Sequence, residues 1–229
     1  MNAKSRRKIE MGKRALNFSQ AHPDPSPGYA AALTRLENRL ARAEDLATQQ
    51  LEGILQVRAA TAQKRELRRT MRRTQLAHIV RVAEAAASEL PELAQKFVAR
   101  PEGTPYVVFR TAARSLVAEA QTQKELLVRH GLTDTVLESL VQSLDEFDQA
   151  IEQGSEGRRS HVGASAELEA VTDEIALIVR VMDGLNGFRF ANDAESLAGW
   201  KSASNTFPAP SGPSKPTVPP TGGEVRPAA

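Results

Sequence analysis

The chain has 229 residues, a formal net charge of +2 and no cysteine. It is long enough to bury a core without disulfides, and the lack of cysteine excludes thiolate nucleophiles, sulfur-ligated zinc and iron–sulfur clusters. Aromatic residues make up only 4% of the chain, which favours packed helices over β-sheets. We therefore expect an all-α protein of a reducing compartment, the cytoplasm.

The sequence contains no obvious membrane segment. No apolar run approaches the roughly 20 residues that span a bilayer. Residues 1–14 are basic and are not followed by an apolar stretch. We expect neither a signal peptide nor a membrane span.

The first predicted helix follows Ser5 and is strongly basic. Its only strong apolar residues are Ile9 and Leu16, so we expect its apolar face to be too small for firm docking. Three alternating prolines then exclude a helix between residues 22 and 28. Residues 1–27 are thus predicted to form a basic N-terminal segment and a proline-rich linker.

A much longer helical pattern begins at Tyr29 and continues to about Ala87. It contains no proline, and Gly53 is a weak breaker. An unbroken helix of this kind would be about 90 Å long. The sequence leaves open whether it breaks near Gly53, breaks in its basic middle, or projects from a bundle. Its first half carries a heptad seam, and the residues that could support self-association there are Leu33, Leu36, Leu40 and Ile54.

The middle of this helix, residues 58–73, is a basic stretch. It holds seven basic residues and one acidic residue, Glu66. Such a surface can bind phosphate groups, but no aromatic residue interrupts it, so any nucleic-acid binding would be non-specific. A solvated face, or a face that contacts an acidic helix, is the alternative. The candidate phosphate contacts are Arg58, Arg65, Arg68, Arg69, Arg72 and Arg73.

Two further helices have clear ends in the sequence. The first is predicted to begin after Thr104 as its N-cap and to end at Gly131. The second, residues 133–156, contains seven acidic residues and no lysine or arginine. Because the connections are short, we expect antiparallel neighbours, with this acidic helix beside the basic stretch.

The remainder of the chain is predicted to contain a loop, two helices and a tail. A polar loop with Gly154, Gly157 and Gly163 is expected to precede a helix that starts at Ser165. A short helix with Trp200 follows. Beyond Ser204 the composition turns to proline, glycine, serine and threonine, which predicts disorder. The predicted domains are residues 1–27, a helical bundle at 28–203, and a tail at 204–229.

No stretch carries a residue spacing that a specific chemistry requires. Phosphate-binding loops, dinucleotide-binding turns, nucleophile elbows and H-E-x-x-H helices are missing from the sequence. None of the four histidines follows a glutamate by three positions, as di-iron bundles require. We expect no catalytic residue, no metal ligand and no cofactor, and hence no enzyme.

These observations predict an all-α fold. We expect an elongated antiparallel helical bundle built on one long helix, with a disordered proline-rich C-terminal tail. The leading interpretation is a non-enzymatic interaction or scaffold protein that binds protein and forms a homo-oligomer through coiled-coil-like packing. The alternative is a non-specific nucleic-acid-associated protein that uses the basic stretch.

Overall fold

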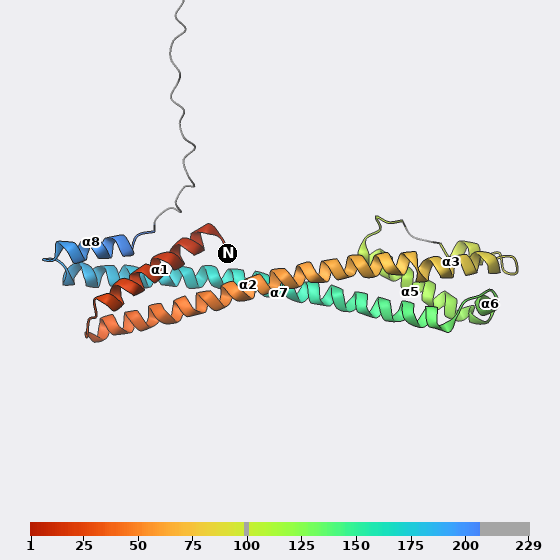
Figure 1. Ribbon diagram of the computed structural model, residues 1–229, viewed down its shortest axis with the longest axis horizontal. Helices are drawn as coiled ribbons and strands as arrows, with labels where there is room; N and C mark the ends of the chain where they lie inside the picture. The colour runs from red at the N-terminus through yellow and green to blue at the C-terminus, as the bar shows by residue number, and fades with distance from the viewer. Residues whose placement is uncertain (99–100, 207–229) are drawn as a thin grey trace, which may run out of the picture. The chain divides into compact units, whose positions relative to one another are not determined.

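A computed structural model describes residues 1–98 and 101–206. The regular structure in this part is entirely helical, which confirms the predicted all-α class (Figure 1). The predicted disordered tail lies, from residue 207 on, outside the described residues. The helices are α1 Ala3–Ala21, α2 Pro27–Arg73, α3 Gln75–Ala86, α4 Leu93–Lys96, α5 Tyr106–Thr122, α6 Lys124–Arg129, α7 Asp134–Arg189 and α8 Ala194–Ala203.

The described chain divides into two compact units. The first contains Met1–Leu46 and the described chain from Ala166 onward, and the second contains Ala47–Ser165. Helices α2 and α7 each contribute one part to the first unit and the other part to the second. Each unit includes part of the predicted bundle of residues 28–203. The boundaries predicted for that bundle, at residues 28 and 203, stay a prediction.

The first unit docks helix α1 firmly, contrary to the expectation from its sequence. Ile9, Met11 and Ala15 are all buried. The Phe18 ring of α1 lies 5.6 Å from the Trp200 ring of α8. The expectation was wrong because it counted only large aliphatic residues, whereas small and flexible side chains also fill helix interfaces.

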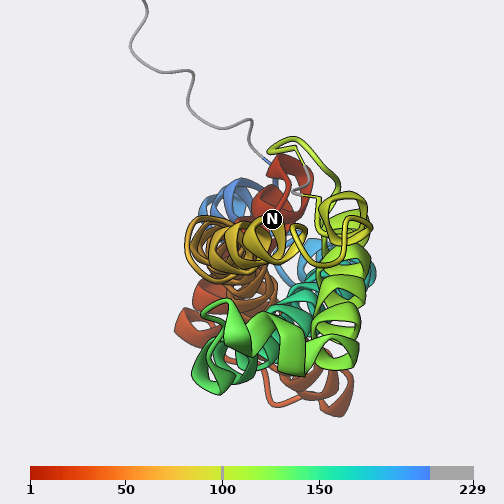
Figure 2. The same cartoon turned by 90° about the vertical axis from the view of Figure 1, so that its right-hand side faces the viewer.

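The second unit is built around one apolar cluster. Phe147 of α7 is fully buried within it, and its ring centroid lies 5.6 Å from that of Tyr106 and 5.9 Å from that of Phe109. Figure 2 shows α3, α5 and the start of α7 around this core. Further members from α3 to α7 are Leu76, Ile79, Ala83, Leu93, Ala113, Leu116, Leu127, Leu137, Leu140 and Leu144.

The long helical pattern breaks at the end of its basic stretch and not at Gly53. Helix α2 ends at Arg73, and Thr74, with φ −111° and ψ −82°, precedes α3. The backbone hydrogen bonds continue across this point, because Thr74 N donates to Thr70 O at 2.9 Å and His78 N donates to Thr74 O at 3.0 Å. The break is therefore a local bend between two hydrogen-bonded helices.

Helix α7 runs without interruption through the region that was predicted to be a loop. The prediction was wrong because glycine here serves close packing. A Cβ atom on Gly53 of α2 would lie 2.7 Å from the carbonyl oxygen of Gly157. The two glycines let the backbones of α2 and α7 approach, which offsets the weak helix propensity of glycine.

The predicted end at Gly131 is confirmed, but the predicted single helix divides at Gln123 into α5 and α6, and the predicted cap at Thr104 is wrong. Gly131 has φ +104°, a conformation that favours glycine at a helix C-terminus. At the start of α5 the N-cap position is held by Pro105. Thr104 lies one residue before the cap position, and its hydroxyl donates to Pro101 O at 2.8 Å within the preceding turn.

Candidate functional site

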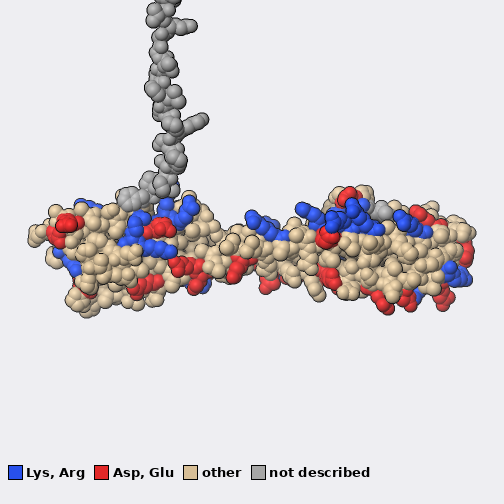
Figure 3. Space-filling view, in the orientation of Figure 1, with Lys and Arg blue, Asp and Glu red and all other residues tan. Residues whose placement is uncertain are grey.

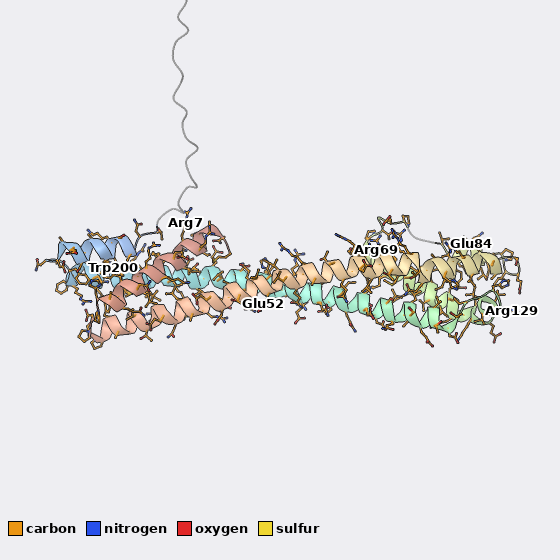
Figure 4. The ribbon with its side chains drawn as sticks, viewed as in Figure 1. Arg7, Glu52, Arg69, Glu84, Arg129 and Trp200 are labelled. Carbon is orange, nitrogen blue, oxygen red and sulfur yellow. The ribbon has the colours of Figure 1, made fainter. Side chains whose placement is uncertain are left out.

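The candidate phosphate-binding arginines all lie on α2 within the second unit. Lysine and arginine side chains gather over this part of α2 in Figure 3, and Figure 4 labels Arg69 among them. Four of the six candidates are exposed, and Arg68 and Arg72 are half-buried. Their surroundings differ, so they do not form one uniform site.

Arg68 has a structural role. Its guanidinium carbon lies 5.5 Å from the Tyr106 ring centroid and 5.4 Å from the Phe109 ring centroid. The same group donates to the carbonyl oxygen of Glu102. These cation–π contacts and this hydrogen bond join α2 to α5 and its preceding loop, so Arg68 has less freedom to meet a ligand.

Three of the remaining candidates line a cavity of about 390 Å³. Arg69, Arg72 and Arg73 contribute from α2, and Arg81 contributes from α3. We call this the arginine cavity. Its apolar lining comes from α3 and α5 and consists of Leu76, Ala77, Val80, Phe109, Ala112, Ala113 and Leu116.

The charge of the arginine cavity is positive. Its four arginines are accompanied by two glutamates, Glu84 and Glu102, which leaves a formal charge of +2. Of these arginines, only Arg69 forms an ion pair within the described chain, with Glu66 at 2.6 Å. Exposed pairs of this kind contribute little and exchange easily. The site therefore combines an apolar surface with guanidinium groups that can accept an anionic partner.

The acidic part of α7 lies beside the basic stretch, as predicted. A Cβ on Gly154 would lie 3.4 Å from Ala60 Cβ and 3.5 Å from Lys64 Nζ. However, Asp145 and Asp148 are paired with arginines of α5. Among the described residues, no ion pair links the basic stretch to this acidic segment.

Two carboxylates of the acidic segment, Asp145 and Asp148, pair with α5. Arg114 lies 2.8 Å from an Asp148 oxygen and 3.0 Å from an Asp145 oxygen. The pKa of Arg114 is raised above its usual value, mainly by its hydrogen bond to Asp148 and to a smaller extent by its hydrogen bond to Asp145. These pairs occupy carboxylates that the basic stretch could otherwise have used, so its own charge stays available.

Sequence reasoning found the arginines of α2 but missed the cavity. The apolar lining from α5 follows the basic stretch by more than thirty positions, so no local pattern joins them. Arg81 was missed because it lies eight positions beyond Arg73, outside the charge run of residues 58–73. Its presence on the exposed side of α3 is a signal that could have added it to the candidate set.

The predicted self-association seam has partners within the chain. Leu36 and Leu40 are buried, and Leu33 and Ile54 are half-buried. A Cβ atom on Gly12 of α1 would lie 3.1 Å from Leu40 and 3.6 Å from Leu36. Self-association through this seam would require these internal contacts to open, and it stays a prediction.

Other indications of function are few. In residues 1–98 and 101–206, no group of three histidine, aspartate or glutamate residues is placed to hold a metal ion. Within the same ranges, none of the helices has the length and apolar character needed to cross a bilayer. No protein-family model matches the chain, and comparisons with curated proteins and solved structures found no match.

Proposed function

We propose that the chain is a non-enzymatic interaction protein that binds an acidic, amphipathic segment of a partner protein in the arginine cavity. The observation that carries this proposal is the combination of unpaired guanidinium groups with an apolar lining. An amphipathic helix can place apolar side chains into such a groove. Carboxylates beside those side chains can then meet Arg72, Arg73 and Arg81 through charge-assisted hydrogen bonds.

The binding would depend on both components of the cavity. Apolar contacts supply affinity that salt does not screen. The arginines supply orientation and a faster association rate, which falls as salt screens the charges. A partner with only one of the two features would bind less well.

A second candidate function is non-specific binding of nucleic acid along α2. Arg58, Arg65, Arg69 and Arg72 fall on one side of this helix, over a length of about 21 Å. Arg58, Arg65 and Arg69 are exposed, so a phosphate backbone could meet several of them. This function would use the arginines without the apolar lining, which separates it from the first proposal.

The test compares two fluorescent probes by anisotropy. One is a 20-residue helical peptide with a leucine stripe flanked by glutamates, and the other is a 20-base single-stranded DNA. We expect the peptide to bind, and we expect the triple change Arg72→Gln, Arg73→Gln and Arg81→Gln to weaken it at least about tenfold. The control removes equal charge from exposed arginines elsewhere, through Arg6→Gln, Arg7→Gln and Arg158→Gln.

A variant of the apolar lining separates the two functions. Ala112→Gln enlarges a half-buried side chain at the cavity without changing its charge. This variant should weaken binding of the peptide and leave binding of the DNA unchanged. Absence of peptide binding at low salt, or an equal loss in the charge-matched control, would overturn the proposal. Failure of the peptide to bind, together with DNA binding that falls in the first triple variant and is unchanged by Ala112→Gln, would support nucleic acid instead.

A further inference from the structure

The last part of α7, in the first unit, leaves one row of large apolar side chains exposed. Leu177 is 59% exposed, Val181 59%, Leu185 39% and Phe188 89%. Steps of four, four and three residues place all of them on one side of the helix. The other side, which carries Ile178 and Met182, is buried in the first unit. We call the exposed row the α7 stripe.

The α7 stripe is almost free of charge. The other residues on this side of the helix between 177 and 188 are Arg180, Gly184 and Gly187, so Arg180 is its only ionisable residue. Exposed helix faces normally carry several charges, whereas the centres of protein interfaces are depleted of them. The stripe therefore has the composition of a contact surface for another apolar surface.

The spacing of the stripe suits a copy of itself. Leu177, Val181, Gly184 and Phe188 follow alternating steps of four, three and four, the spacing of the core positions of a heptad. In an antiparallel pair of such helices, Leu177 lies opposite Phe188 of a second copy. Val181 then lies opposite Gly184 of that copy. Both layers share one two-fold axis, as a closed dimer requires.

Gly184 makes this register sterically complementary. A Cβ atom on Gly184 would have no atom of its own chain within 4 Å. The glycine therefore leaves a recess between the larger side chains of the stripe. Val181 of a second copy would fill that recess, so a large residue meets a small one in the two central layers.

We infer that the α7 stripe pairs antiparallel with the same stripe of a second copy of the chain, about a two-fold axis between residues 182 and 183. The exposed side chains supply on the order of 400 Å² of apolar surface per copy. A pair would bury about 1,000 Å² once the flanking atoms are included, the lower end for a specific interface. The dimer is therefore weak and depends on concentration. This inference does not rest on the arginine cavity.

The first experiment is sedimentation equilibrium of the full chain between about 1 μM and about 1 mM. We expect a monomer–dimer equilibrium that Phe188→Glu weakens at least tenfold. Phe188 contacts little of its own chain, so the variant stays folded, which circular dichroism will verify. The matched control is Val107→Glu on α5, another exposed apolar residue, and it should leave the equilibrium unchanged. A wild-type chain that stays monomeric at about 1 mM overturns the inference and assigns the stripe to residues 207–229 or to a different protein.

Gly184→Leu distinguishes the specific antiparallel pairing of the α7 stripe from non-specific apolar association. The leucine has space within its own chain and improves helix propensity. It would nevertheless fill the recess that receives Val181 of the second copy. The antiparallel seam predicts at least a tenfold weaker dimer, whereas non-specific apolar association would become stronger, and that result would overturn the inference.

Cross-linking tests the orientation, because the chain has no native cysteine. In the proposed register, two copies of residue 181 are about 4.5 Å apart along the axis and two copies of residue 170 are about 38 Å apart. A short bismaleimide should join Val181→Cys chains and leave Ala170→Cys chains unlinked. Linking of both variants indicates a parallel pair, and linking of neither indicates no pair. Either result overturns the inference.

Discussion

The cores of the two units contain different kinds of contact. In the first unit, the buried residues include Ser5, Ser19, Thr172 and Asn186. In the second unit, the core cluster from Met71 to Phe147 is wholly apolar, and the buried Gln50 lies outside it. The interior of the first unit therefore combines apolar packing with directional polar contacts, whereas the core cluster of the second unit consists of apolar packing alone.

The buried polar contacts of the first unit form a short network. Tyr29 Oη donates to Ser19 Oγ at 2.8 Å and accepts from Asn186 Nδ2 at 3.4 Å. A displaced partner would leave a buried donor unpaired, at a cost of about 1–3 kcal/mol. Apolar packing tolerates small displacements better. The comparison teaches that buried hydrogen bonds add to apolar packing in positioning the helices of the first unit, whereas the core cluster of the second unit relies on side-chain volume.

The largest expected effect comes from removing a central ring of the second unit. Phe147→Ala should lower the free energy of unfolding by about 3–5 kcal/mol, because it leaves a cavity in the apolar cluster. Trp200, the single tryptophan, is buried in the first unit, so its fluorescence reports on that unit. In a urea titration of this variant, the circular dichroism signal of the helices should begin to fall at a lower urea concentration than the Trp200 fluorescence signal changes. Equal shifts of both signals would show that the units unfold together and would break the comparison.

A smaller effect should follow from the close contact between α2 and α7. Gly53→Ala places a Cβ atom 2.7 Å from the carbonyl oxygen of Gly157 and 2.9 Å from His161 N, so the helices must separate. We expect a loss of about 1–3 kcal/mol in urea unfolding. Gly163→Ala, on α7, is the control, because a Cβ atom there has open space and the variant should gain about 0.5–1 kcal/mol. A gain in both variants would contradict close backbone packing.

Tyr29→Phe tests the polar network of the first unit. It removes the acceptor of Asn186 Nδ2 and the donor to Ser19, so we expect a loss of about 1–2 kcal/mol in unfolding followed by Trp200 fluorescence. Tyr106→Phe in the second unit is the control. Its hydroxyl makes no hydrogen bond within the described chain, so the change should be close to neutral. Equal effects would remove the proposed difference between the cores.

The smallest effect is a pH dependence at the start of α8. Hydrogen bonds from Ser196 lower the pKa of Asp193, the N-cap of that helix. A lowered folded pKa means that the contribution is full above the ordinary aspartate pKa of about 3.9 and is lost as pH falls through the folded value. Asp193→Asn keeps a capping oxygen. In this variant the free energy of unfolding, measured by Trp200 fluorescence, should fall less steeply as pH decreases below about 4. An unchanged pH dependence would show that other carboxylates control the acid sensitivity of the free energy of unfolding.

Much of the fold follows from the sequence. The prolines before α2 and the glycine after α6 end helices because backbone geometry leaves few alternatives there. The predicted loop at Gly154, Gly157 and Gly163 was wrong, because α7 includes all three glycines. A helical glycine costs only about 1 kcal/mol relative to alanine, so contacts between helices can outweigh it.

The candidate sites were less predictable than the fold. The arginines of α2 were visible as a charge run, but their partners were not. Asp148 pairs with Arg110 and Arg114 of α5, which leaves the basic stretch with fewer internal partners than its acidic neighbour suggested. The α7 stripe also escaped prediction, because periodicity shows that a helix has apolar faces without showing which face is covered.

The sequence by itself determined the helical class and the helix ends near the prolines and at Gly131. These features depend on each residue's own backbone and side chain. Tertiary structure alone decided that α7 is continuous, that Leu36 and Leu40 are covered, and that the α7 stripe is exposed. It also joined the arginines of α2 to an apolar lining from α5. These outcomes depend on which distant segments meet, and the free energy of those contacts exceeds the local preferences that a sequence pattern records.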